Sequence, residues 1–193
     1  MVTEIELKAH VRYNEDFKAL LSQKAEYGGS FDKQDVYWFG PEASAFPAKV
    51  RVRREKRCLA DGTEESRCLV TYKSKEENNG IEVNEELEFE VEPVEAFEEF
   101  LEKAGLRPGA GKIKRGWVFL KEKITAELVE VDGLGWFVEL EILVNAENRR
   151  EKKITAAKET LLAFLDSLGI EREAIESRYY LDMLSSADHK TDN

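Results

Sequence analysis

The sequence predicts an α+β protein in which eight strands form an antiparallel barrel or a strongly curved sheet, with helices packed outside it. About eight segments alternate apolar and polar residues, as strands do. Most of these segments follow one another through short turns, which is typical of antiparallel connections. Amphipathic helical segments occur early, in the middle and at the end of the chain. An open eight-stranded sheet is the main alternative.

The first part of the chain is expected to form a strand, a helix and a second strand. Residues 4–12, EIELKAHVR, alternate in character and predict a strand. Asn14 is a candidate helix cap, and the glycine pair at 28–29 is expected to end the helix. Apolar residues at helical spacing lie between them: Phe17, Leu20, Leu21 and Ala25. Residues 31–39 predict the next strand, and 41–48 a loop between two prolines.

The middle of the chain predicts three strands and a helix. The strands are 48–55, 67–75 and 81–92, and the first two are joined through the turn signal Asp61–Gly62. Pro93 then suits the first turn of a helix over VEAFEEFLEKAGL. Apolar residues of this segment fall on one stripe, so we expect the helix to pack on the sheet.

The last part of the chain predicts three more strands and then two helices. The strands are 112–121, 124–132 and 136–144, and the last two are separated by a tight GLG turn. The helices are expected over 147–169 and near 171–186. We expect one domain over residues 1–186 and a frayed C-terminal tail over 187–193.

Composition and charge narrow the class of protein. Of the 193 residues, 42% are hydrophobic and 36% are charged, which fits a folded, soluble chain rather than a disordered one. The net charge of −11 argues against nucleic acid or an anionic membrane as the main partner. A small anion can still bind within a local cluster of cations. The chain has only 2 histidines, which argues against a histidine-rich zinc site or a serine–histidine hydrolase.

The sequence indicates a cytoplasmic protein. The segment MVTEIELK has no basic stretch followed by an apolar run, so no signal peptide is expected. No apolar stretch approaches the roughly 20 residues that span a bilayer. Cys58 and Cys68 are too few for a disulfide framework or a thiolate metal site, and we interpret them as reduced thiols. The oligomeric state stays open, a homodimer included.

Charged side chains share one face of nearly every predicted strand. In 48–55, Lys49, Arg51, Arg53 and Glu55 lie opposite Val50 and Val52. The same alternation places further polar side chains together on the other strands: Glu4, Glu6 and Lys8; Lys73; Asn84, Glu86, Glu88 and Glu90; Glu130 and Asp132; Glu139 and Glu141. Helices must cover a face of the sheet, and the apolar face is the obvious one. The charged face would then line the inside.

An interior lined by charges indicates a charged ligand. Burying unpaired ions is costly, so such an interior must be wet, mutually neutralised or built to hold something charged. Arginine and lysine suit phosphate oxygens, and carboxylates in i, i+2 pairs suit Mg²⁺ or Mn²⁺. Together they predict a polyphosphate bound with its metal ions. The alternative is a set of cross-strand salt bridges on an exposed sheet face.

An ordered set of motifs resembles the CYTH superfamily, the triphosphate-tunnel proteins that include class IV adenylyl cyclases, thiamine triphosphatases and inorganic triphosphatases. The opening ExExK signature is Glu4 to Lys8. The resemblance continues through QDVYW (34–38), RVR (51–53), TYK (71–73), EELE (85–88), KRGW (114–117), VDGLGWFVELE (131–141) and SRYYLDML (177–184). ExExK alone is a weak signal, but the ordered set with GLGxFVExE is specific and spans nearly the whole chain.

The resemblance implies an eight-stranded antiparallel tunnel that binds a triphosphate with a divalent metal, Mg²⁺ or Mn²⁺. The positions that match the family's phosphate-binding cations are Lys8, Arg51, Arg53, Lys73 and Arg115. The positions that match its acidic side, only some of which bind metal directly, are Glu4, Glu6, Glu86, Asp132, Glu139 and Glu141. Tyr37 and Lys73 resemble a catalytic pair that acts as a base or orients water in hydrolytic members.

The resemblance leaves the reaction open. The contexts of QDVYW and TYK look most like the class IV cyclase branch, which would convert ATP to cyclic AMP and pyrophosphate. Hydrolysis of a terminal phosphate of inorganic or thiamine triphosphate is the alternative, since the same cavity serves both reactions. A non-catalytic polyphosphate-binding module is a third reading, and the intact acidic and basic positions argue against it.

Overall fold

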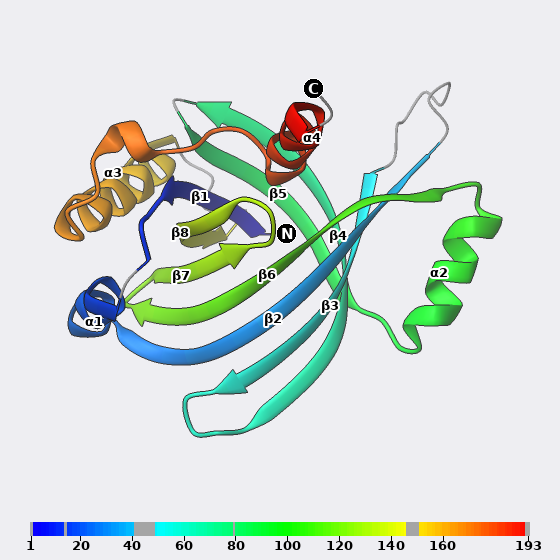
Figure 1. The fold of residues 1–193 in the computed structure, drawn as a ribbon, viewed down its shortest axis with the longest axis horizontal. Coiled ribbons are helices and arrows are strands. Elements are labelled where there is room, and N and C mark those ends of the chain that lie inside the picture. Colours follow the sequence, from blue (N-terminus) through cyan, green and yellow to red (C-terminus); the bar gives the residue numbers. More distant parts are fainter. Residues whose placement is uncertain (1, 14, 41–48, 79, 146–150, 192–193) are drawn as a thin grey trace.

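The eight predicted strands form a closed antiparallel barrel, which confirms the fold class (Figure 1). The computed structural model describes residues 2–13, 15–40, 49–78, 80–145 and 151–191, so the loop predicted at 41–48 lies outside the described residues. Around the barrel the strands follow the order β1-β5-β4-β3-β2-β6-β7-β8, and β1 pairs with both β5 and β8. Their bounds are β1 Val2–His10, β2 Glu26–Phe39, β3 Lys49–Leu59, β4 Glu64–Asn78, β5 Ile81–Glu90, β6 Arg107–Lys121, β7 Ile124–Val131 and β8 Gly135–Asn145.

Two strands, β2 and β6, begin five residues earlier than the sequence predicts. β2 starts at Glu26, so the glycine pair at 28–29 belongs to a strand and does not end the helix, which stops at Lys24. The register of β2 against β6 shifts between Tyr27 and Gly29, and Gly29 has φ +132, a conformation that side chains other than glycine rarely adopt. β6 starts at Arg107 because this end pairs with Phe39 at the end of β2.

Two helices cover one flank of the barrel from outside. They are α1 (Glu15–Lys24) and α3 (Glu151–Ser167), at the left of Figure 1. They bury the outward apolar face of β1, β6, β7 and β8 in the largest core of the protein, which includes Ile5, Leu7, Leu21, Phe119, Leu128, Leu140, Leu161 and Leu165. Removing this apolar surface from water is the main stabilising contribution of the flank. The expected assignment of faces is confirmed for most of this flank, where apolar residues point out and charged residues point in. On β7 it is wrong toward the end of the strand, because Val129 faces inward and Glu130 is exposed outside.

A smaller core lies under α2 (Val94–Lys103), on another part of the wall. Val94 and Leu101 of the helix pack with Trp38 of β2 and Val52 of β3, all of them buried. Pro93 directly precedes the helix, close to its expected place in the first turn.

The last helix, α4 (Tyr180–Thr191), lies over one end of the barrel (Figure 1). Its Tyr180 and Met183 pack with the inward-facing Phe31, Val129 and Phe137. A single helix near 171–186 was expected, but only the short 3₁₀ helix η2 (Arg172–Ala174) precedes α4. The chain between them is held extended by β1, since Ala9 bridges Ile175 and the Glu176 N–H donates to the Lys8 carbonyl at 2.8 Å.

The C-terminal segment is helical as far as Thr191, within the stretch 187–193 that was expected to form a frayed tail. Among the described residues, no helix combines the length and the apolar character that crossing a membrane requires. Neither described cysteine is in a disulfide bond, as expected.

Candidate active site

One cavity of about 590 Å³ runs through the barrel, a size typical of ligand sites. Its wall comes from the inner faces of all eight strands and from residues 179–181 at the start of α4. Of the described side chains that line it, ten are lysine or arginine and nine are glutamate. The cavity as a whole is therefore close to neutral, and what matters is how the two signs are arranged.

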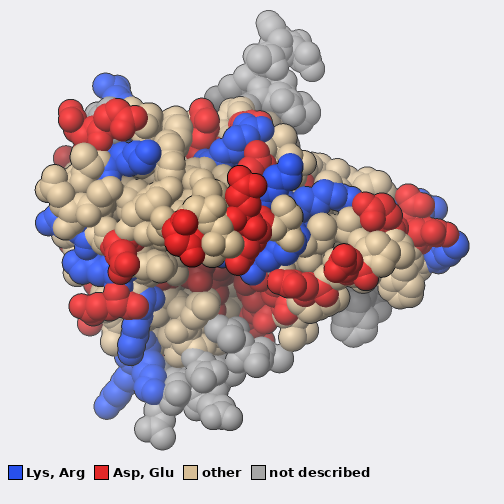
Figure 2. All heavy atoms as spheres, turned by 90° about the horizontal axis from the view of Figure 1, so that it is seen from below, with Lys and Arg blue, Asp and Glu red and all other residues tan. Residues whose placement is uncertain are grey.

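The two signs occupy opposite halves of the cavity wall. All but one of the lining glutamates lie on four adjacent strands, β7, β8, β1 and β5: Glu127, Glu139, Glu141, Glu4, Glu6, Glu82, Glu86 and Glu88. All but one of the lining cations lie on the other four strands, β4, β3, β2 and β6: Lys73, Arg67, Arg57, Arg53, Arg51, Lys49, Lys33, Lys112 and Lys114. The outer surface differs, because acidic and basic residues are interleaved over the face in Figure 2. We call these two parts of the cavity the acidic half and the basic half.

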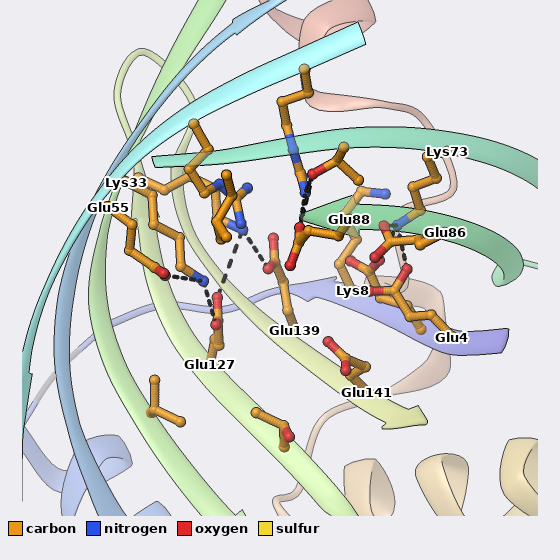
Figure 3. Close-up of a pocket in the computed structure, with 18 of the residues that line it drawn as sticks. Glu4, Lys8, Lys33, Glu55, Lys73, Glu86, Glu88, Glu127, Glu139 and Glu141 are labelled. Carbon is orange, nitrogen blue, oxygen red and sulfur yellow. Dashed lines mark hydrogen bonds and ion pairs between the residues drawn. The ribbon is translucent and has the colours of Figure 1, made fainter. Parts of the chain in front are cut away.

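Lys73 of β4 reaches into the acidic half (Figure 3). Its Nζ donates to Glu4 and lies 3.1 Å from Glu6 Oε2 and 3.2 Å from Glu86 Oε1. Burial lowers the pKa of Lys73, but these three carboxylates outweigh it and raise the pKa well above its ordinary value. Lys73 is therefore held as an ammonium ion, which suits charge balance or phosphate binding rather than accepting a proton.

The acidic half has too little positive charge around Glu141 and Glu4 to balance their carboxylates. Glu141 points into the cavity, and none of the residues drawn in Figure 3 pairs with it. Burial, then repulsion from Glu4, Glu6 and Glu127, raises the pKa of Glu141 to about 8. Burial and the neighbouring Glu6 likewise raise the pKa of Glu4 to about 7, although Lys73 opposes them. Additional positive charge at this place would relieve both effects.

The two halves meet in the middle of the cavity through alternating charges. Lys33 donates to Glu127 at 2.5 Å, and Lys114 donates to Glu139 at 2.5 Å. Burial raises the pKa of Glu139, but Lys114 and the Tyr180 hydroxyl outweigh it and hold the pKa well below its usual range. Glu139 is therefore ionised and already paired, unlike Glu141 two residues further along β8.

Two cations of the basic half, Arg53 and Lys112, are positioned by Asp35. Arg53 donates to its two carboxylate oxygens at 2.6 and 2.9 Å, and Lys112 Nζ lies 3.5 Å from it. Lys112 also donates to the Tyr37 hydroxyl at 3.0 Å. Burial raises the pKa of Tyr37, but the Lys112 and Arg51 cations outweigh it and lower the pKa below the ordinary tyrosine value. The hydroxyl of Tyr37, which lines the cavity, is therefore polarised by these cations.

Most of the predicted site residues line this one cavity. They are Glu4, Glu6, Lys8, Tyr37, Arg51, Arg53, Lys73, Glu86, Glu139 and Glu141. Lys8 is among them, but its Nζ is paired with Glu82 Oε1 at 3.1 Å. The structure thus brings together groups that lie more than a hundred residues apart in the sequence.

Arg115 and Asp132 were expected in the cavity, and this placement is wrong. Both side chains are 47% exposed on the outer surface, where Arg115 bridges Asp132 and Asp32 at 3.0 Å each. For Arg115 the reason is strand alternation: Lys112 and Lys114 of β6 point inward, so Arg115, the next residue along the strand, points outward.

The motif comparison also missed several cavity residues. The clearest are Lys33, Glu55, Glu82, Lys112, Lys114 and Glu127, together with Asp35, which is buried and paired with the lining Arg53. A signal for some of them was present, because Lys33, Asp35 and Tyr37 alternate along FDKQDVYWF in the same way as the charged residues of the other strands. Lys112 and Lys114 follow the same rule in KIKRGW.

The donor set of the acidic half fits a hard divalent cation. Carboxylate oxygens are the ligands that Mg²⁺ and Mn²⁺ prefer, and the repulsion at Glu4 and Glu141 is the kind that such a cation removes. Within the described part of the chain, no three acidic, histidine or cysteine side chains already form a cation site. Lys73 instead lies among Glu4, Glu6 and Glu86. These carboxylates would hold a metal ion after Lys73 moves away from them.

A closed eight-stranded barrel with acidic and basic halves around a central cavity defines the class of protein. Residues 3–180 match the CYTH domain, so the chain belongs to the CYTH family and the resemblance seen in the motifs is confirmed. A curated relative, "Putative adenylate cyclase MJ0240" of Methanocaldococcus jannaschii, is 26% identical over 186 residues, which cover 93% of this chain and 97% of the relative.

Solved structures show the same fold. The PH1819 protein from Pyrococcus horikoshii OT3 has a TM-score of 0.78 and 25% identity, covering 95% of this chain and 98% of that protein. The Hippeastrum protein "Putative adenylyl cyclase HpAC1", which is described as having a dominant triphosphatase activity, has a TM-score of 0.60 and 19% identity. That likeness covers 96% of each chain and concerns the fold.

Proposed function

We propose that this protein is a divalent-metal-dependent enzyme that acts on a triphosphate substrate inside the barrel. The observation that carries the proposal is the separation of the cavity wall into an acidic and a basic half. A triphosphate bound with metal ions presents negative oxygens on one side and cations on the other. The basic half suits the phosphate oxygens and the acidic half suits the metal ions, so each half of the cavity contacts ligand groups of the opposite charge.

The basic half would bind and orient the phosphate chain. Arg51 and Lys112 flank Tyr37, and Arg53 is held in a fixed orientation by its two bonds to Asp35. Lys33 and Lys114 extend the same surface toward the acidic half. Preorganised cations of this kind stabilise charge on a transferring phosphoryl group without having to reorganise during the reaction.

The acidic half would hold Mg²⁺ or Mn²⁺ through Glu4, Glu6, Glu86, Glu139 and Glu141, with only some of these as direct ligands. When bound, the metal ion supplies charge neutralisation at the phosphate oxygens. Lys73 can then turn its ammonium from the carboxylates to a phosphate oxygen. Because its pKa is raised, Lys73 contributes as a cation that orients the reacting groups, and Tyr37 contributes its polarised hydroxyl beside them.

The finer proposal is a class IV adenylyl cyclase-like reaction. The ribose 3′-hydroxyl oxygen of ATP would bond to the α-phosphorus, and the bond from that phosphorus to pyrophosphate would break. The relative named as an adenylate cyclase supports this reaction. Attack by water on a terminal phosphorus is the second candidate, and the triphosphatase activity attributed to the Hippeastrum protein of the same fold favours it.

Phosphorus NMR of the purified protein with Mg²⁺ or Mn²⁺ separates these reactions. ATP, inorganic triphosphate and thiamine triphosphate are offered separately. Cyclic AMP and pyrophosphate from ATP would establish the cyclase reaction, and orthophosphate from any of the three would establish hydrolysis. Binding without any product would reduce the protein to a polyphosphate-binding module, and absence of binding would contradict the proposal.

A further inference from the structure

The cavity changes its chemistry toward the end that lies away from α4. There the wall carries four aliphatic side chains: Leu59 of β3, Val118 and Leu120 of β6, and Leu143 of β8. We call these four residues the aliphatic shelf. Thr125 of β7 is beside them, and the nearby Arg57 and Arg67 both form ion pairs with Glu55. One continuous cavity thus joins an ionic section to an apolar one.

The aliphatic shelf leaves apolar surface uncovered on the inside of the barrel. Leu120 is 48% exposed and Leu143 58% exposed, although both lie on the inward-facing side of their strands. Gly28 of β2 contributes to this opening, because a Cβ at Gly28 would lie 3.5 Å from both Leu120 and Val118. Exposed apolar surface in a concave wall is what a ligand with an apolar part would remove from water.

The aliphatic shelf is also close enough to the ionic section for one ligand to reach both. On β8, Leu143 is two residues from Glu141, which is about 7 Å along a strand. On β6, Val118 is four residues from Lys114, which is about 13 Å. A phosphate chain among the cations would therefore direct a group attached to its end toward the aliphatic shelf.

We propose that the substrate is a triphosphate ester whose organic group is apolar where it meets the aliphatic shelf, and that this contact selects esters over inorganic triphosphate. The inference rests on the proposed function, because it requires a triphosphate in the ionic section. It adds the chemical class of the attached group, which the charged residues do not decide.

Calorimetry with Mg²⁺ tests the inference, with inorganic triphosphate and with methyl, butyl and hexyl triphosphate as ligands. Each methylene that leaves water should raise the affinity about two- to fourfold, so hexyl triphosphate should bind at least about thirtyfold more tightly than methyl triphosphate. Equal affinity for the methyl and hexyl esters would overturn the inference while leaving triphosphate binding intact. Failure of inorganic triphosphate itself to bind would overturn the proposed function, and this inference with it.

A double variant, Leu120→Ser with Leu143→Ser, tests the location. It should weaken hexyl triphosphate at least about tenfold and leave inorganic triphosphate unchanged, since the serines replace apolar contact surface only. Leu87→Ser is the matched control, because Leu87 of β5 is 53% exposed but does not line the cavity. Equal losses in the double variant and the control would overturn the location. The chain-length series needs no variant and decides the inference even if the double variant does not fold.

Discussion

Lys73 of β4 donates a hydrogen bond to Glu4 of β1, although β5 lies between these two strands in the barrel wall. The contact reaches over β5, whose Glu86 also pairs with Lys73. It places the ammonium of a basic-half strand among the carboxylates of the acidic half. We therefore expect this ion pair network to couple the proposed metal and phosphate binding to stability.

Replacing Lys73 with methionine should destabilise the metal-free protein by about 1–3 kcal/mol, because Glu4, Glu6 and Glu86 then lose their shared cation. Adding Mg²⁺ should recover much of this loss, since the metal ion replaces the missing positive charge. Urea unfolding with and without Mg²⁺ measures both effects. Lys103→Met is the matched control: its ion pair with Glu99 is exposed at the surface, so its loss should change stability by less than about 0.5 kcal/mol. A result of the same size for both variants would contradict the coupling.

The metal-free protein should become less stable as the pH rises from 6 to 9. The folded-state pKa values of Glu4 and Glu141, about 7 and about 8, lie above the ordinary value of 4.5, so the folded state binds these protons more tightly than the unfolded state. The stability that protonation of Glu4 and Glu141 adds to the folded state is fully present below about pH 4.5. It is lost as the pH rises through 7 and 8. Unfolding midpoints measured in a chelator should show the decline, and Glu141→Gln should flatten it. A midpoint that does not change over this range would refute the assignment.

Glu141→Gln should abolish most of the activity with little loss of stability. The change removes a negative charge from the acidic half, and loss of a carboxylate near the metal ion should reduce turnover by at least about tenfold at saturating Mg²⁺. Glu130→Gln is the matched control, since Glu130 lies on β7 but is exposed and does not line the cavity. Turnover rates and unfolding curves of both variants are compared with the unmodified protein. Unchanged activity of the Glu141 variant would remove it from the metal-binding set.

Two adjacent residues of β6 should differ sharply in their effect on triphosphate binding. Lys114→Met removes a buried cation from the basic half and should weaken binding about ten- to a hundredfold, as expected for a lost charge-assisted contact. Arg115→Met removes a cation that pairs with Asp32 and Asp132 on the outer surface, and affinity should change less than about twofold. Calorimetry of both variants with triphosphate and Mg²⁺ provides the comparison. Equal weakening would mean that charge in general, and not the inward position, determines binding.

Much of the site could be predicted from alternation within single strands. Glu4, Glu6 and Lys8 share a face of β1, and Glu139 and Glu141 share a face of β8, because successive side chains point to opposite sides. The same rule places Arg115 outside and Lys114 inside, so the misplacement of Arg115 came from following the motif rather than the alternation. Alternation placed Asp132 and Glu130 on one face, but that face of β7 points outward, because Val129 and Val131 are the inward-facing residues there.

The amino-acid sequence by itself determined the elements, the family and which side chains share a face, because these follow from local periodicity and from motifs in order. Only the tertiary structure decided which faces meet. The pairing of β5 with both β1 and β4 brings Glu4 to Lys73, and the pairing of β1 with β8 joins the acidic strands into one half of the cavity wall. Closure of the barrel also places the exposed side chains of Leu120 and Leu143 on the wall of the same cavity. Such contacts depend on the stagger and tilt of strands that are far apart in sequence, and no local pattern records these quantities.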